Sequence, residues 1–147
     1  MGKHLTSLLA LDDVEVSVTS RRRRSSTATV TYIEGNAHDL EFLEPLLNQR
    51  WDAIVDFMVY TTTSFRERVN LLLSATSHYV YLSSARVYAD SAEPITEDSP
   101  RLLDVTKDEE YLATDEYALA KAREEDLLRN SGQKNWTIIR PYITYSE

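Results

Sequence analysis

The sequence contains no cysteine, which excludes disulfide bonds, thiolate catalysis and cysteine-based zinc sites. Its three histidines, His4, His38 and His78, are far apart and lack the spacing of metal ligands, so we expect no metal site. No apolar run approaches the roughly 20 residues that span a bilayer. The N-terminus does not resemble a signal peptide, because Asp12 and Asp13 follow only a short apolar segment. We therefore expect a cytoplasmic protein.

Positive charge is also scarce, with 16 Lys and Arg against 24 Asp and Glu. The resulting net charge of -8 and pI near 4.9 argue against a general binder of nucleic acids or anionic membranes. A length of 147 residues, 42% of them hydrophobic and 27% charged, is typical of one soluble globular domain with a sizeable core. We expect neither a nucleic-acid partner nor a membrane partner.

Hydrophobic periodicity predicts strands that alternate with helices along the chain. The predicted strands span residues 14–18, 30–33, 52–60, 79–82 and 136–139. The predicted helices span residues 3–11, 38–50, 64–77 and 116–129, and residues 89–113 form an irregular surface excursion. This alternation predicts βαβ units, and hence an α/β fold with a parallel sheet.

Two local features refine this prediction. The strand at 52–60 is almost continuously apolar, as in a strand buried on both faces, and is interrupted only by Asp56. We interpret Asp56 as a structural, hydrogen-bonded acid rather than a functional carboxylate. Thr114 or Asp115 is expected to cap the last helix, and Glu116 suits its positive end.

Tyr117 and Lys121 lie four residues apart in the last predicted helix, so their side chains project from the same face. A free phenol has a pKa of about 10 and is a poor base at neutral pH, but a nearby ammonium favours the phenolate. Ser84 follows the strand at 79–82, and its hydroxyl could hydrogen-bond a reacting alcohol or carbonyl oxygen. Together the three side chains form a proton-transfer device suited to chemistry at a carbinol carbon.

The spacing of Tyr117 and Lys121 is weak evidence by itself, because the chain contains nine tyrosines. Such a pair arises by chance in roughly one comparable sequence in four. The alternative is a surface helix that carries an amphipathic tyrosine and a solvated lysine. The surrounding motifs must decide between these interpretations.

Four motifs follow one another along the chain. They are Gly35-Asn-Ala-His-Asp39, Leu82-Ser-Ser-Ala-Arg-Val-Tyr88, Tyr117-Ala-Leu-Ala-Lys121 and Trp136-Thr-Ile-Ile-Arg-Pro141. Their types and order resemble the extended short-chain dehydrogenase/reductase superfamily, in its NAD(P)-dependent epimerase/dehydratase group. The resemblance spans essentially the whole chain, although Asn36 stands where the family pattern has an acid. It implies a partial Rossmann-like fold, a doubly wound parallel sheet in three α/β/α layers.

The resemblance also implies roles for the proton-transfer residues. Tyr117 would be the general acid/base, and Lys121 would assist it and hydrogen-bond the nicotinamide ribose. Ser84 would hold and polarise the oxygen of a sugar or sugar-nucleotide substrate. A hydride would move to or from nicotinamide, while the protein supplies position and charge. In epimerases and dehydratases this hydride returns within one turnover, and in reductases it does not.

The cofactor implied by the resemblance is NADP or NAD. Arg21 and Arg22 follow the strand at 14–18, where an acid marks NAD use and an arginine can accept a 2′-phosphate. They therefore slightly favour NADP, and the alternative is a solvated basic loop. The other cofactor-binding candidates besides Lys121 are Gly2, Asn36, Phe57, Met58, Tyr142 and Thr144.

The chain departs from the family at both ends. The family begins with a strand and a glycine-rich turn, whereas here only Gly2-Lys-His-Leu5 resembles the last glycine and its helix. The missing strand would leave those at 14–18 and 52–60 facing a gap. The family also continues beyond Glu147 into a substrate-binding part. We therefore expect residues 1–147 to be an incomplete NAD(P)-binding Rossmann domain, a fragment that alone binds NAD(P) poorly and is inactive.

Two interpretations from other functional classes stay open. One is a non-catalytic binding or regulatory module, which the missing glycine turn favours and the Ser84, Tyr117 and Lys121 set opposes. The other is a structural partner whose sheet is completed by another chain. The sequence does not separate epimerase from dehydratase or reductase, and it leaves open whether a homodimer forms.

Overall fold

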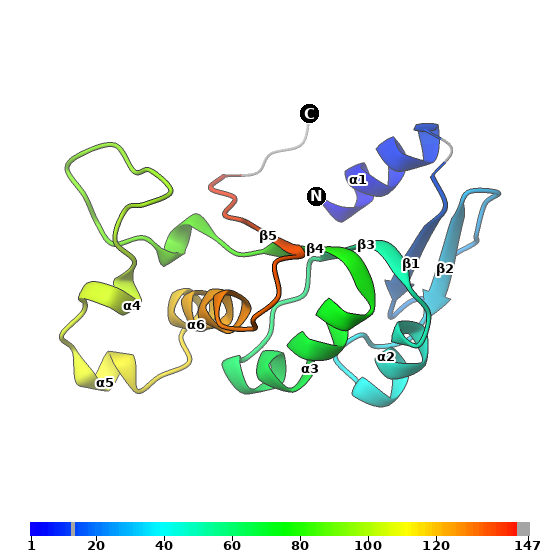
Figure 1. Cartoon of the computed structure of the whole chain (residues 1–147). Coiled ribbons are helices and arrows are strands. Elements are labelled where there is room, and N and C mark those ends of the chain that lie inside the picture. The colour runs from blue at the N-terminus through cyan, green and yellow to red at the C-terminus, as the bar shows by residue number, and fades with distance from the viewer. Residues whose placement is uncertain (13, 144–147) are drawn as a thin grey trace. The chain divides into compact units, whose positions relative to one another are not determined.

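The computed structural model describes residues 1–12 and 14–143, and the chain divides into two compact units, Met1–Gln49 and Arg50–Glu147. Both units contain a parallel sheet, and in the second unit helices connect the strands, so the chain has a partial Rossmann-like α/β fold, as the resemblance implies (Figure 1). None of the helices in the described residues has both the length and the apolarity to cross a membrane.

The first unit contains a two-stranded parallel sheet. Its elements are α1 (Gly2–Leu9), the 3-10 turn η1 (Ala10–Asp12), β1 (Val16–Ser20), β2 (Val30–Glu34) and α2 (Leu40–Leu47). The strand predicted at 14–18 begins later because the Val14 amide still donates to Leu9 O at 3.3 Å, at the end of the helical segment. The ladder starts where Val16 lies opposite Val30. Asp39 caps α2 by accepting a hydrogen bond from the Glu41 amide at 3.1 Å.

The second unit contains a three-stranded parallel sheet in the order β3-β4-β5. Its strands and long helices are β3 (Trp51–Asp56), α3 (Thr62–Ser74), β4 (Thr76–Leu82), α6 (Tyr117–Arg129) and β5 (Trp136–Ile139). Helices α3 and α6 lie on the same side of this sheet (Figure 1) and contact each other. Phe65 of α3 packs against Tyr81 of β4 with ring centroids 5.1 Å apart, and both side chains are fully buried. This aromatic contact lies in the core between helix and sheet.

The strands β1 and β3, which were expected to face a gap, belong to different sheets. Within residues 1–12 and 14–143, β1 pairs only with β2 and β3 pairs only with β4. Each of these strands therefore keeps one edge without a strand partner in the described part of the chain.

The prediction of a long strand buried on both faces was wrong. Strand β3 ends at Asp56, Ala53 is exposed, and Phe57 and Val59 are 38% and 57% exposed. The strand ends because the buried Asp56 carboxylate accepts a hydrogen bond from the Met58 amide at 2.8 Å and turns the chain.

Asp56 has the structural role that the sequence favours. Its second carboxylate oxygen accepts hydrogen bonds from the hydroxyls of Tyr60 (3.0 Å) and Tyr79 (2.7 Å). Burial nevertheless raises the pKa of Asp56, because desolvation of the carboxylate outweighs these hydrogen bonds. The three donors come from the turn after β3 and from two buried tyrosines.

The cap predicted for α6 also differs. Glu116 is the N-cap and accepts a hydrogen bond from the Ala118 amide at 2.7 Å. Asp115 instead accepts a hydrogen bond from the Thr62 amide at 2.8 Å, at the N-terminus of α3. Both carboxylates therefore lie at positive helix ends, but on different helices.

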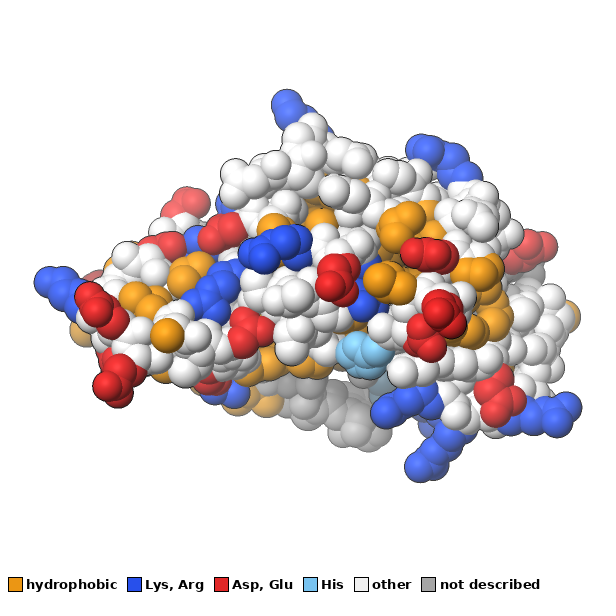
Figure 2. Space-filling model, turned by 90° about the horizontal axis from the view of Figure 1, so that it is seen from below, with side chains coloured by type: hydrophobic (Ala, Val, Ile, Leu, Met, Phe, Trp, Pro, Cys, Tyr) orange, Lys and Arg blue, Asp and Glu red, His pale blue; other side chains and the backbone are white. Residues whose placement is uncertain are grey.

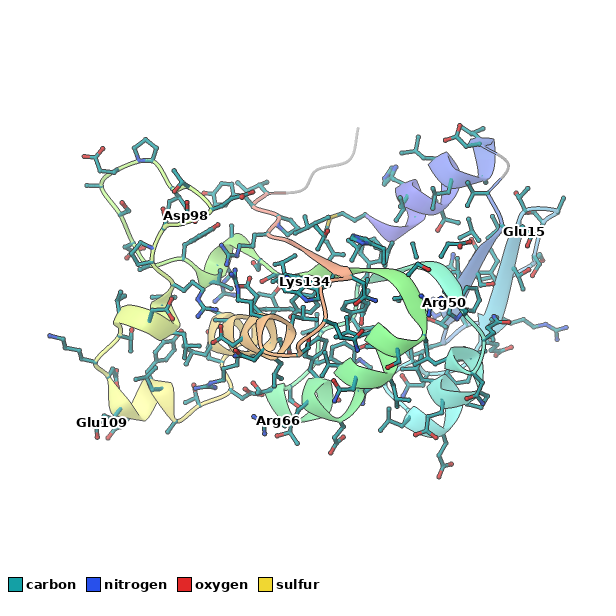
Figure 3. All side chains as sticks on the ribbon, viewed as in Figure 1. Glu15, Arg50, Arg66, Asp98, Glu109 and Lys134 are labelled. Atoms are coloured by element: carbon teal, nitrogen blue, oxygen red, sulfur yellow. The ribbon has the colours of Figure 1, made fainter. Side chains whose placement is uncertain are left out.

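The excursion at 89–113 is less irregular than expected. It contains two single-turn helices, α4 (Leu102–Val105) and α5 (Glu109–Leu112). Arg101 fixes it to α6 through an ion pair of 2.8 Å with Asp126, and a second ion pair of 2.8 Å, with Asp104, lies within the segment itself. The exposed Glu109 projects outward from this segment, as the labelled side chain in Figure 3 shows.

Gly35 offers a direct test of packing in the first unit. A Cβ atom at this position would overlap the ring of Phe42 on α2. We expect Gly35→Ala to lower the free energy of unfolding by about 1–3 kcal/mol, because the ring or the turn must move. Urea denaturation followed by circular dichroism measures this cost.

Phe42→Ala provides the matched background, since it removes the obstructing ring. Gly35→Ala should cost much less in this background than in the wild-type chain. An equal cost in both backgrounds would show that the overlap is not the cause.

Candidate active site

Ser84 is the second residue after β4, at the carboxyl end of the sheet. Its hydroxyl caps the 3-10 turn η2 (Ala85–Val87) by accepting a hydrogen bond from the Arg86 amide at 3.2 Å. The Ala85 amide donates to Pro141 O at 2.9 Å, so the segment after β4 runs beside the segment after β5. Ser84 itself is half-buried.

Tyr117 and Lys121 both lie on α6, on the same face of successive turns. The half-buried Tyr117 ring lies beneath the Arg86 guanidinium, whose central carbon is 5.3 Å from the ring centroid. Because Arg86 is only two residues beyond Ser84, this contact places the serine turn beside the first turn of α6.

Lys121 is fully buried rather than solvated, which excludes a surface lysine at this position. Its ammonium donates to Tyr81 Oη at 3.0 Å, Glu124 Oε2 at 3.2 Å and Met58 O at 3.4 Å. An ammonium has three N–H donors, and these acceptors account for all of them. The contact with Met58 O is the longest and therefore the easiest to replace.

Glu124 and Tyr81 are the two buried side chains that hydrogen-bond the Lys121 ammonium. The Tyr81 hydroxyl donates to the same Glu124 oxygen that accepts from Lys121. Burial raises the pKa of both groups, and the negative charge of Glu124 raises that of Tyr81 further. Tyr81 therefore remains a protonated phenol that donates a hydrogen bond, while the other Glu124 oxygen has no hydrogen-bond partner among the described residues.

Glu125 joins three elements at the carboxyl end of the sheet. Its fully buried carboxylate accepts from Ser83 Oγ at 2.6 Å and from Arg140 at 2.8 and 2.6 Å, the latter through Nε and Nη2. Burial opposes ionisation, but the hydrogen bonds from Arg140 and Ser83 and the nearby positive charges outweigh it, and the pKa of Glu125 is lowered. The ends of β4 and β5 are thereby fixed to α6.

Sequence reasoning did not single out Glu125, although a signal for it existed. Glu125 lies four residues after Lys121 and eight after Tyr117, so all three share one helix face. An acid on the predicted core-facing side of a helix requires a partner. The Arg140-Pro141 motif, noted only as a resemblance, supplies that partner.

The cofactor candidates of the second unit differ in their surroundings. Met58 lies beside Lys121 through its carbonyl oxygen, which brings those two candidates together. Phe57 is 38% exposed and Tyr142 is 86% exposed. Thr144 lies outside the described residues.

The candidates of the first unit lie on three separate segments. Gly2 begins α1, and the exposed Arg21 and Arg22 follow β1. Asn36 lies after β2, where its side-chain oxygen accepts a hydrogen bond from the His38 amide at 3.2 Å and closes the turn. Within the parts of the chain that the structure describes, no group of three or more potential ligand side chains could hold a metal ion.

Replacing Glu125 tests the network at the sheet end. We expect Glu125→Gln to lower the free energy of unfolding at neutral pH by roughly 3–5 kcal/mol, because the mostly buried Arg140 loses its counter-charge. Arg140→Gln added to this variant should cost far less than it does alone, and chemical denaturation of all four proteins measures the coupling. Additive costs would contradict a shared network.

The same substitution predicts a dependence on pH. The pKa of Glu125 is lowered from its ordinary 4.5, so its contribution to stability is complete above that value and is lost as the pH falls through the lowered folded-state pKa. The stability difference between wild type and Glu125→Gln should therefore shrink in acid. A difference that stays constant down to pH values well below 4.5 would contradict this assignment.

No protein-family model matches the chain, and no curated protein matches it by sequence. Solved structures do match. A protein from Burkholderia cenocepacia J2315, provisionally described as an epimerase, is 20% identical with a TM-score of 0.68 over 96% of this chain and 50% of its own. Epimerase Mth375 from Methanothermobacter thermautotrophicus is 18% identical with a TM-score of 0.70, over 95% of this chain and 47% of its own.

A third structure, MoeE5 in complex with UDP-glucuronic acid and NAD, is 17% identical with a TM-score of 0.63, over 93% of this chain and 48% of its own. The chain therefore spans about half the length of these three proteins. At this low sequence identity, the similarity establishes the fold alone. The chain has a Rossmann-like α/β architecture that matches about half of each of these three structures.

Proposed function

We propose that this chain forms the nicotinamide-cofactor and proton-transfer part of an NAD(P)-dependent epimerase-like oxidoreductase that acts on a sugar or sugar nucleotide. The observation that carries the proposal is the packing of the Ser84 turn against the first turn of α6, the helix that bears Tyr117 and Lys121. The structural neighbours support it, since two are described as epimerases and the third holds NAD and UDP-glucuronic acid.

Each of the three residues has a distinct task in this proposal. Ser84 Oγ hydrogen-bonds the reacting oxygen of the substrate, and Tyr117 Oη gives a proton to that oxygen or takes one from it. Lys121 exchanges its longest contact, to Met58 O, for a hydroxyl of the nicotinamide ribose. Nicotinamide, when bound, supplies the hydride chemistry. The lysine can make this exchange without giving up Tyr81 or Glu124.

A second function is a non-catalytic binding module of the same fold. This alternative is favoured because all three N–H donors of the Lys121 ammonium already have acceptors within the protein, as expected for a structural lysine. Turnover separates the two functions. In a longer protein that contains this chain and a substrate-binding part, conversion of a sugar nucleotide that is lost in Tyr117→Phe, while cofactor binding persists, is the behaviour of an enzyme and not of a binding module.

Cofactor binding can be mapped on this chain even when it is weak. Titration of the 15N-labelled protein with NAD should shift the amide resonances of Met58, Ser84 and Lys121, because the nicotinamide half of the cofactor lies beside them. ATP is the matched control, since it carries adenine and phosphates without nicotinamide. Shifts that are absent at millimolar NAD, or that are the same with ATP, would overturn the proposal.

The preference for NADP has its own test. We expect the double variant Arg21→Ala/Arg22→Ala to weaken NADP binding roughly tenfold and to leave NAD binding unchanged, because the 2′-phosphate loses a charge-assisted partner. Arg23→Ala/Arg24→Ala removes the same charge from the same exposed loop and is the control. An unchanged ratio of NADP to NAD affinity in the first variant excludes Arg21 and Arg22 from this role.

A further inference from the structure

The side chain of Arg86 lies next to Tyr117 because the backbone around it is fixed. Ser84 caps the 3-10 turn that contains Arg86, and the next residue, Val87, is fully buried. The Arg86 side chain is nevertheless 66% exposed. The backbone of Arg86 is therefore held in place while its guanidinium faces solvent. Such a side chain can reach a bound molecule without disturbing the core.

Two contacts orient this guanidinium. It lies over the ring of Tyr117 at 5.3 Å, and its Nη2 donates to Glu116 Oε1 at 2.9 Å. Glu116 is itself held by the Ala118 amide and by the Tyr111 hydroxyl at 3.0 Å. Burial opposes the ionisation of Glu116, but these hydrogen bonds and the charge of Arg86 outweigh it, and the pKa of Glu116 is lowered. Glu116 therefore remains a charged anchor at neutral pH.

Most N–H groups of the Arg86 guanidinium have no acceptor among the described residues of the protein. A guanidinium has five N–H donors, and within residues 1–12 and 14–143 only the Nη2 group of Arg86 has a protein acceptor. The neighbouring cations Lys121 and Arg140 are mostly buried, and they are paired with Glu124 and Glu125. Arg86 is also paired, with Glu116, but its side chain is 66% exposed, so of these three cations it is the one that a molecule at Tyr117 can reach.

The chemistry of a planar, fork-shaped cation matches oxygen anions, which accept two parallel hydrogen bonds from it. An anionic molecule also needs such a cation here, because the chain carries a net charge of -8 that repels it at long range. On the face drawn in Figure 2, acidic and basic side chains are interspersed.

We propose that Arg86 binds an anionic group, a carboxylate or a phosphate, of the molecule whose oxygen exchanges a proton with Tyr117. This inference rests on the proposed function. It narrows the substrate class to sugars or sugar nucleotides that carry a carboxylate or a phosphate, and it excludes uncharged sugars. Arg86 is then a specificity-determining residue, placed by the turn that Ser84 caps and oriented by Glu116.

Binding of UDP-glucuronic acid and UDP-glucose to the wild-type chain and to Arg86→Gln tests the proposal. We expect Arg86→Gln to weaken UDP-glucuronic acid binding at least tenfold in NMR titrations. Arg66→Gln is the control, because Arg66 is an exposed arginine of α3 that points away from the sheet (Figure 3). UDP-glucose distinguishes the two anions: its affinity is unchanged if Arg86 binds the sugar carboxylate and falls equally if Arg86 binds the diphosphate.

A second measurement needs no substitution. In the wild-type chain, the Nε–Hε resonance of Arg86 should shift on addition of UDP-glucuronic acid. The proposal is overturned if this resonance does not move, or if Arg86→Gln, shown to be folded by circular dichroism, binds both probes as well as the wild type does.

These outcomes are separate from those of the proposed function. Failure of NAD to shift Met58 and Lys121, with binding of UDP-glucuronic acid still dependent on Arg86, would remove the proposed function and leave the anion site. Conversely, if NAD shifts these resonances but sugar-nucleotide binding does not depend on Arg86, the proposed function stands and the anion site at Arg86 is excluded.

Discussion

The carboxylate of Glu125 is buried without access to solvent, and it is stable there because Ser83 and Arg140 donate hydrogen bonds to it. Burying a charge costs several kcal/mol unless it is paired and hydrogen-bonded, so the three groups must keep their positions together. The geometry of the candidate site follows from this requirement. Ser84 is covalently next to Ser83, and Tyr117 begins the helix that carries Glu125. The positions of Ser84 and Tyr117 relative to each other therefore depend on this network, although neither side chain belongs to it.

Helix α6 carries a second fully buried acid, Glu124, one residue earlier. Glu124 receives hydrogen bonds from Lys121 and Tyr81, and this arrangement commits the lysine that a nicotinamide ribose would need. A ligand at Lys121 competes with protein acceptors rather than with water. That competition is mild only at Met58 O, where the contact is longest. The structure thus accommodates either a structural lysine or a catalytic one, and the difference between them is a single carbonyl contact.

Much of the arrangement could be predicted from local sequence. The alternation of apolar segments gave the order of strands and helices, and the spacing of Tyr117 and Lys121 placed both on one helix face, because periodicity is a property of neighbouring residues. The failures were also local in origin. The apolar residues after Asp56 resemble a continued strand, but the carboxylate of Asp56 binds the Met58 amide and ends it. Asp115 resembles a cap for α6, but it is held by Thr62 at the start of α3.

The sequence by itself determined the α/β order of this chain and placed Tyr117 and Lys121 on one helix face, since both depend on spacing along the backbone. Only the tertiary structure decided which side chain hydrogen-bonds each buried carboxylate and ammonium. Ser83 and Glu125 are 42 positions apart and Lys121 and Tyr81 are 40 apart, so no local pattern specifies that they meet. Burial then makes these pairings obligatory, because a carboxylate or ammonium removed from water must find its partner within the fold.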